Sequence, residues 1–135
     1  MSAATISGLA AFLVYFAGAV AYGALFCAIY TRVTPHREFD LIVNQHNASA
    51  AVAFGMTLIG FAIPLSNAVH IASSVVEFLI WGLIAMVVQF AAYGLANLAY
   101  PGLSKAIEQN ALAAALWSGS VAIATGLVSA ACMSP

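Results

Sequence analysis

Glu77 is the first candidate for chemistry in this 135-residue chain. It is the one formal charge inside an apolar stretch, and an ionisable group at membrane depth is a functional hypothesis by default. Pro64, in the preceding apolar stretch, would leave the carbonyl near Gly60 without its usual donor. The polar side chains that follow within two helical turns are Ser66, Asn67 and His70. These residues predict a polar site that could bind a proton or a cation, with Pro64 as a helix kink.

A structural role competes with this interpretation. Ser74 and Glu77 have the S-x-x-E spacing of a capping box at the start of a helix. A carboxylate in the first turn also interacts favourably with the helix dipole. The polar residues after Pro64 would then simply meet water or lipid headgroups.

A second polar segment, RVTPHREFDLIVNQHN, runs from Arg32 to Asn47. It holds four of the seven charged residues and two of the three histidines. Thr34 followed by Pro35 has the pattern of a helix N-cap with proline at the first helical position, and apolar residues then recur at helical spacing. The sequence predicts a short amphipathic helix on the cytoplasmic membrane surface, or a docking surface for a partner protein. The residues of this surface would be Arg32, His36, Arg37, Glu38 and Asp40.

The composition places all of these residues in a membrane protein. The chain is 64% hydrophobic and 5% charged, with a mean hydropathy of +1.05, whereas a soluble domain has about 25% charged residues. Too little polar surface is available to cover a globule in water. The expected partner is therefore the lipid bilayer, and a net charge of -1 gives no footprint for nucleic acid.

Four apolar stretches are long enough to cross a bilayer, which takes about 20 residues. They run from about 6 to 30, 48 to 69, 75 to 100 and 111 to 133. Isolated strands cannot satisfy their backbone in lipid, so all four are predicted as helices. The predicted fold is all-α, a single membrane domain over 1–135 built as a four-helix bundle.

The basic residues predict the orientation of this bundle. All three lie in the first and third loops: Arg32, Arg37 and Lys105. The positive-inside rule places these loops in the cytoplasm. Both termini would then be periplasmic.

Short segments recur along the chain. FLVY from residue 12 reappears as FLIW from residue 78, and NASAAVAF from residue 47 reappears as NALAAALW from residue 110. Each unit would contain two spans, so both units insert in the same orientation. The sequence therefore predicts two tandem parallel two-helix repeats, at about 6–70 and 73–133.

The last apolar stretch carries a small residue at every fourth position. Such a stripe lets helix backbones approach closely in lipid. It predicts tight packing, either inside the bundle or between copies of the chain. The residues predicted to pack are Ala114, Ser118, Ala122 and Gly126 of this stretch, and Gly55 of the stretch that matches it in the first repeat.

Several other chemistries lack their residues. Haem ligation across a membrane needs two histidines at matching depth, and only His70 lies near the end of a span. The sequence has no Cys/His spacing typical of zinc, no phosphate-binding glycine motif and no convincing nucleophile–base pair. We therefore expect no enzymatic activity, no metal site and no cofactor.

Four segments of the chain resemble a known family, in order along nearly its whole length: YTRVTPHREFDLI, NASAAVAFGMTLIGFAIPLSNAV, EFLIWGLIAMVVQ and SAACM. They are similar to the YjfL-like small inner-membrane proteins of bacteria, catalogued as a domain of unknown function. The resemblance implies an inner-membrane protein with four spans, and it carries over no catalytic residue. The matching landmarks, whose roles it leaves open, are Thr34, Pro35, Asn47, Pro64, Glu77, Asn110 and Cys132.

Three functions remain open at this point. The first is a non-enzymatic component that self-associates or joins other proteins in a membrane complex. The second is a small ion channel or transporter that uses Glu77, Asn67 and His70. The third is a membrane redox subunit that binds quinone or haem, which the lack of paired histidines argues against.

Overall fold

The fold is entirely helical in the part of the chain that the computed structural model describes, residues 2–134. Two short helices, α2 (Glu38–Val43) and α5 (Leu103–Glu108), accompany four long ones. Each long helix is long and apolar enough to cross a membrane. The predicted all-α class with four spans is confirmed, and every predicted boundary lies within three residues of the observed one. The long helices are α1 (Ala3–Val33), α3 (Ala48–Ile71), α4 (Val75–Ala99) and α6 (Leu112–Cys132).

Local side-chain caps define where three of the long helices begin. Ser2, Asn47 and Ser74 each accept a hydrogen bond from the backbone N–H three residues further on. Such caps satisfy donors that have no partner inside the helix, and each contributes about 1 kcal/mol.

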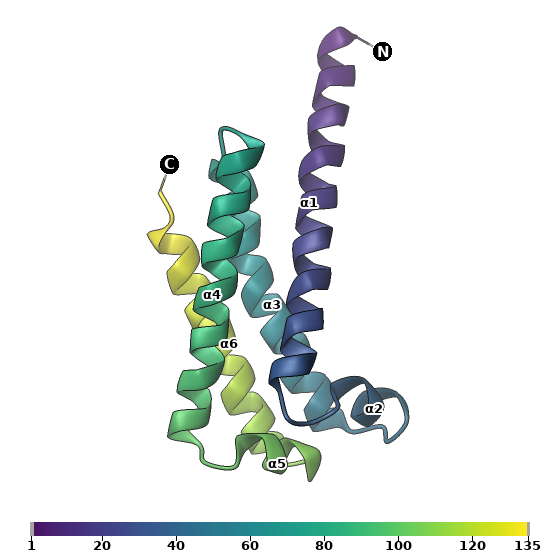
Figure 1. Cartoon of the computed structure of the whole chain (residues 1–135), viewed down its shortest axis with the longest axis vertical. Coiled ribbons are helices and arrows are strands. Elements are labelled where there is room, and N and C mark those ends of the chain that lie inside the picture. The colour runs from purple at the N-terminus through teal and green to yellow at the C-terminus, as the bar shows by residue number, and fades with distance from the viewer. Residues whose placement is uncertain (1, 135) are drawn as a thin grey trace.

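The short helices and the chain termini lie at opposite ends of the molecule (Figure 1). We call the end formed by residues 34–47 and 100–111, which includes α2 and α5, the loop end. The opposite end, with both termini and the turn between α3 and α4, is the terminal end. The order long helix, short helix, long helix occurs twice along the chain, as a duplication would produce, but the duplication itself stays a prediction.

A close backbone contact joins α3 to α6, the two helices that pack together most extensively. A Cβ added at Gly60 would lie 2.5 Å from the carbonyl oxygen of Ala122, and a Cβ at Gly126 would collide with the carbonyl oxygen of Gly60. Pro64 is buried in α3, and its missing N–H leaves that Gly60 carbonyl without a partner inside the helix. A glycine Cα–H of α6 can take the donor's place. Helix α3 therefore continues through Pro64, because the neighbouring helix contacts the carbonyl that the proline leaves unpaired.

The predicted small-residue stripe lies in the contact between α3 and α6. Ala114, Ser118, Ala122 and Gly126 are all buried in α6, and α6 packs most extensively against α3. Gly55, in contrast, is half-buried, and an added Cβ would meet nothing there.

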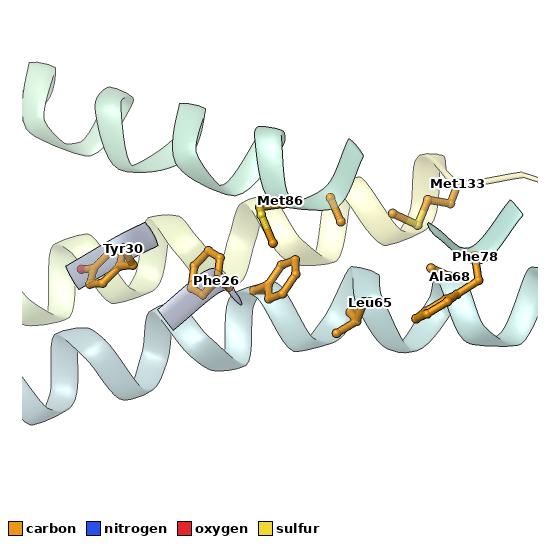
Figure 2. Close-up of a cluster of buried hydrophobic side chains, with 9 residues drawn as sticks. Phe26, Tyr30, Leu65, Ala68, Phe78, Met86 and Met133 are labelled. Carbon is orange, nitrogen blue, oxygen red and sulfur yellow. The ribbon is translucent and has the colours of Figure 1, made fainter. Parts of the chain in front are cut away.

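An aromatic and aliphatic core runs along the bundle between these helices. Figure 2 shows its side chains in a row from Tyr30 to Met133. Phe26 of α1 stacks on Phe61 of α3, with ring centroids 4.5 Å apart, and on Phe90 of α4, 5.2 Å away. These stacked rings hold α1 against the other helices.

Only the last third of α1 is held in this way. Its buried residues are Phe26 and Tyr30, and its N-terminal part extends past the other helices at the terminal end (Figure 1). Further up the helix, Tyr22 donates a hydrogen bond to the Leu79 carbonyl, and Tyr15 packs edge-on against Phe78.

Two local predictions at the loop end were wrong. Thr34 ends α1 instead of capping α2, because its N–H and hydroxyl both bond to the carbonyl of Tyr30. Helix α2 begins at Glu38 without a side-chain cap. The segment 101–110, predicted as a loop, contains α5, which Gly102 starts from a left-handed conformation with a φ of 74°.

The contact of α3 with α6 can be tested by adding one methyl group. Gly126→Ala should lower the free energy of unfolding by about 1–3 kcal/mol, because the methyl group collides with backbone that has no room to move. Gly94→Ala, at a helical site with nothing within 4 Å, is the control and should raise it by about 0.5–1 kcal/mol, because alanine loses less backbone entropy than glycine in a helix. Unfolding by SDS in detergent micelles, followed by circular dichroism, measures both. Equal stability of the two variants would contradict the close approach.

Candidate functional site

Glu77 belongs to a helix cap at the terminal end. The Ser74 hydroxyl accepts from the Glu77 N–H at 3.2 Å. The carboxylate of Glu77 accepts from the N–H of Ser73 at 2.8 Å and from its hydroxyl at 2.5 Å. The capping interpretation is thus observed, with one difference: the carboxylate reaches back to Ser73, one residue before the cap.

The other polar groups predicted beside Glu77 have different surroundings. The Asn67 amide donates to the Ala130 carbonyl of α6 at 2.8 Å, while Ser66 and His70 are exposed. Within residues 2–134, no hydrogen bond joins Asn67 or His70 to Glu77. A shared polar site of these residues stays a prediction without a contact to support it.

The predicted charged surface at the loop end divides into an exposed part and a buried part. Arg32 and Arg37 are exposed and Asp40 is partly exposed. His36 and Glu38 are each only 1% exposed, so the prediction that they form an open docking surface was wrong. Helix α2 packs against α3, and this contact turns the start of α2 inward.

The buried part forms the most distinctive polar site in the described chain. We call it the Glu38 cluster, and its members are Tyr30, Thr34, His36, Glu38 and Ser104. The Thr34 hydroxyl bonds to the Glu38 carboxyl and lies 2.9 Å from the Tyr30 carbonyl. The Nδ1 atom of His36 lies 2.5 Å from the Ser104 hydroxyl of α5. The cluster therefore joins the end of α1, the start of α2 and the start of α5.

The cluster leaves several buried polar atoms without partners. Within residues 2–134, Glu38 Oε2, His36 Nε2 and the Tyr30 hydroxyl have no hydrogen bond. His36 Nε2 comes within 3.2 Å of Glu38 Oε1, but without the alignment that a hydrogen bond needs. Each such group costs about 1–3 kcal/mol, so the arrangement is expensive for a purely structural role.

The charge state of His36 follows from its burial. Desolvation lowers the pKa of His36, and the nearby carboxyls of Glu38 and Glu108 offset this only in part. The imidazole is therefore neutral near pH 7. It contributes hydrogen-bonding atoms to the cluster and no positive charge.

Sequence reasoning missed three residues in or beside this cluster. The first is Tyr30, whose hydroxyl is buried. The second is Tyr93 of α4, which packs edge-on against the Tyr30 ring with centroids 5.6 Å apart. The third is Ser104, whose hydroxyl contacts the His36 imidazole. The spacing of Phe26 and Tyr30 on one helical face was the only signal for any of them. Ser104 reaches the cluster because the chain turns at Gly102, and no sequence motif predicted this turn.

Two asparagines tie the segments of the loop end together. The Asn47 amide donates to the carbonyls of Ile107 and Glu108, at 3.1 and 3.2 Å. Asn110 returns the contact, because its side-chain oxygen accepts from the Ser49 N–H at 3.1 Å. Asn47 and Asn110 occupy equivalent places in the predicted repeats, and both connect the start of α3 with the segment that follows α5.

One further polar group lies deep in the bundle. Gln89 of α4 is 2% exposed, and its amide donates to the Ala122 carbonyl at 3.2 Å. Its side-chain oxygen has no partner within the described residues. This bond adds a polar contact to the place where α3 and α6 approach most closely.

Four apolar helices with polar groups at both ends define a multi-pass membrane protein of the helical-bundle class. The chain belongs to the family described as Domain of Unknown Function (DUF350), whose model matches residues 4–133. It is 41% identical over 128 residues to the UPF0719 inner membrane protein YjfL of Escherichia coli strain K12, with 95% of this chain and 96% of that protein covered. The protein of the same name from Escherichia coli O157:H7 matches equally well. No solved structure matches the chain. The family resemblance of the sequence segments is thereby confirmed.

Asn47 offers a test of how the loop end is held. Asn47→Ala should lower the free energy of unfolding by about 2–3 kcal/mol, because it removes a helix cap and the two side-chain hydrogen bonds to the carbonyls of Ile107 and Glu108. Asn44→Ala, which removes only an exposed hydrogen bond to Asp40, is the control and should cost less than about 0.5 kcal/mol. Thermal unfolding in detergent compares the two. A loss no larger for Asn47→Ala than for the control would refute the tie.

Glu77 can be tested with a pair of substitutions. Glu77→Gln keeps an oxygen that accepts from Ser73 and should leave the stability close to that of the unsubstituted protein. Glu77→Ala removes the acceptor and should lower the stability by more than Glu77→Gln does. The same unfolding measurement separates them. Equal losses for both variants would show that the negative charge of Glu77, and not its hydrogen bonds, is what the helix end requires.

Proposed function

We propose that the protein is a non-enzymatic component of a membrane assembly and that it self-associates through α1. One observation carries the proposal: the part of α1 that precedes Tyr15 is exposed throughout. This part of a long apolar helix is left for contact with lipid or with another protein.

The length of α1 exceeds what a single span needs. Its 31 residues extend for about 46 Å at 1.5 Å per residue, while the hydrocarbon core is about 30 Å thick. Large apolar side chains project from the part of α1 before Tyr15, and each is about half exposed: Ile6, Leu9, Phe12, Leu13 and Val14.

The N-terminal half of α1 also leaves a gap of about 340 Å³ beside α3. Gly8, Phe12 and Tyr15 line it from α1, and Val69 lines it from α3. A Cβ added at Gly8 would meet nothing within 4 Å. In lipid, close packing at small residues favours helix association more than burial of apolar area does, so this surface suits a second helix.

The other predicted means of action have less support from the contacts. The small-residue stripe of α6 is already covered by α3. Of the residues in the channel hypothesis, Glu77 is engaged in a helix cap and Asn67 in an interhelical bond.

We also infer that the loop end faces the cytoplasm and both termini face the periplasm. The three basic residues lie at or beside the loop end, Arg32 in the last turn of α1, Arg37 directly before α2 and Lys105 in α5, and positive charge favours the cytoplasmic side. The inner membrane location named for the relatives agrees with a chain that contacts lipid along four helices.

Crosslinking tests the assembly through α1. In a background with Cys27 and Cys132 replaced by serine, Gly8→Cys should form a disulfide-linked dimer in oxidised membranes. Val128→Cys, on α6, is 64% exposed but lies on a different helix, and it should stay monomeric. The native mass of the gently extracted protein should be a multiple of 13.9 kDa.

A bare monomer together with no crosslinking at Gly8 would refute self-association. A mass that fits one copy bound to a different protein would replace self-association with an accessory role. Equal crosslinking at both positions would show random collisions in the membrane and would not support an interface on α1.

A further inference from the structure

We propose that a groove between α4 and α6 at the terminal end binds one acyl chain of a membrane phospholipid. The groove has a volume of about 500 Å³. Its lining residues differ from those of the gap beside α1, so the proposal goes beyond the assembly role given to that helix.

Small and apolar side chains form the walls of the groove. Helix α4 contributes Trp81, Ile84 and Val88, and the other wall comes from the stretch 124–133 at the end of α6. The lining residues within the described chain are all uncharged. Such walls suit a hydrocarbon ligand and offer no counter-charge to an ion.

The groove exists because α6 lacks an aromatic ring that α3 has. In the predicted repeats, NASAAVAF from residue 47 matches NALAAALW from residue 110, and the same offset pairs Phe61 of α3 with Ala124 of α6. Phe61 is buried and stacks on Phe26 in a core that also contains residues of α4. Ala124 has no ring for the corresponding place, and the flank of α4 beside it stays open.

The groove is continuous with the surface that the bilayer covers. Ile84 of α4 and Val128 of α6 line it, and they are 41% and 64% exposed. An unfilled gap at this place would leave its lining without dispersion contacts on one side. Water does not compensate, because a water molecule needs several polar partners. Lipid from the surrounding bilayer therefore fills the groove.

The dimensions of the groove favour an acyl chain over a helix. The wall from Ala124 to Met133 is about 13 Å long at 1.5 Å per residue. This length is close to half of the hydrocarbon core, about 15 Å, so one chain of the leaflet at the terminal end spans the groove. A helix of that length, about 10 Å wide, would occupy about 1000 Å³, and only its side chains could enter.

Fluorescence quenching by brominated lipid tests what occupies the groove. The chain has two tryptophans, so Trp117→Phe leaves Trp81, on the wall of the groove, as the reporter. In vesicles of phosphatidylcholine with brominated acyl chains, Trp81 should emit much less light than in the same vesicles without bromine, because bromine quenches on contact.

Filling the groove should remove most of this quenching. Ala124→Phe adds the ring that α3 has at the matching position, and Ala124 is exposed, so the bundle has room for it. Leu127→Phe is the control, because Leu127 is 56% exposed on α6 and does not line the groove, and it should leave the quenching unchanged. Ser129→Leu, a second filling variant, should act as Ala124→Phe does if the larger ring disturbs folding. Quenching that stays the same in both filling variants would overturn the proposal, because lipid would then reach Trp81 from outside the groove.

The native mass of the gently extracted protein gives an independent measurement. Each 13.9 kDa chain should carry the added mass of one phospholipid, kept in Leu127→Phe and lost in Ala124→Phe. A chain without this added mass, or one that keeps it after Ala124→Phe, would overturn the proposal.

These results separate the lipid site from assembly through α1. Trp81 that is not quenched, in an oligomer that Ala124→Phe breaks apart, would show that a second copy covers the groove, and the lipid site would be refuted while self-association stands. Quenched Trp81 together with no crosslinking at Gly8 and a monomeric mass would refute the assembly and leave the lipid site standing.

Discussion

The close approach of α3 and α6 at Gly60 and Gly126 is the contact on which the rest of the bundle depends. Two helices can come this near only where neither has a side chain in the way. In lipid no hydrophobic force presses helices together, so backbone contact and polar bonds must hold them. Gln89 adds such a bond at the same depth. With α3 and α6 fixed, α4 packs against both, and α1 has a surface to join.

The remaining structure shows how a chain in lipid distributes its polar groups. Most are gathered at the two ends of the bundle, where caps and loop contacts satisfy them. The Gly60 carbonyl, freed by Pro64, instead meets a glycine of the neighbouring helix. The Glu38 cluster is the exception, because it encloses a carboxyl and an imidazole that the loop end could have left in water. This contrast is why the cluster, more than the exposed charges around it, is the candidate for function.

The spans, their boundaries and the family could be predicted from the sequence, because each depends on long runs of apolar residues or on matched segments. The cap at Ser74 and Glu77 could be predicted from its spacing. The roles of Thr34 and Pro35 could not, since the pattern that suits a helix start also suits the end of α1, and packing of α2 on α3 decides between them. The burial of Glu38 was missed for the same reason, because the six residues of α2 do not reveal which face meets protein. His36 lies before α2, and its burial depends on a tertiary contact with Ser104. Ser104 and Tyr93 join the cluster through tertiary contacts alone.

The pairing of the second long helix with the last has a consequence for how the protein is made. A ribosome at about 5–20 residues per second releases α3 into the membrane several seconds before α6 exists. During that interval the amides of Asn67 and Gln89 lack the α6 carbonyls to which they later donate. The nascent chain therefore stays in the bilayer without the contact between α3 and α6 until α6 has been synthesised.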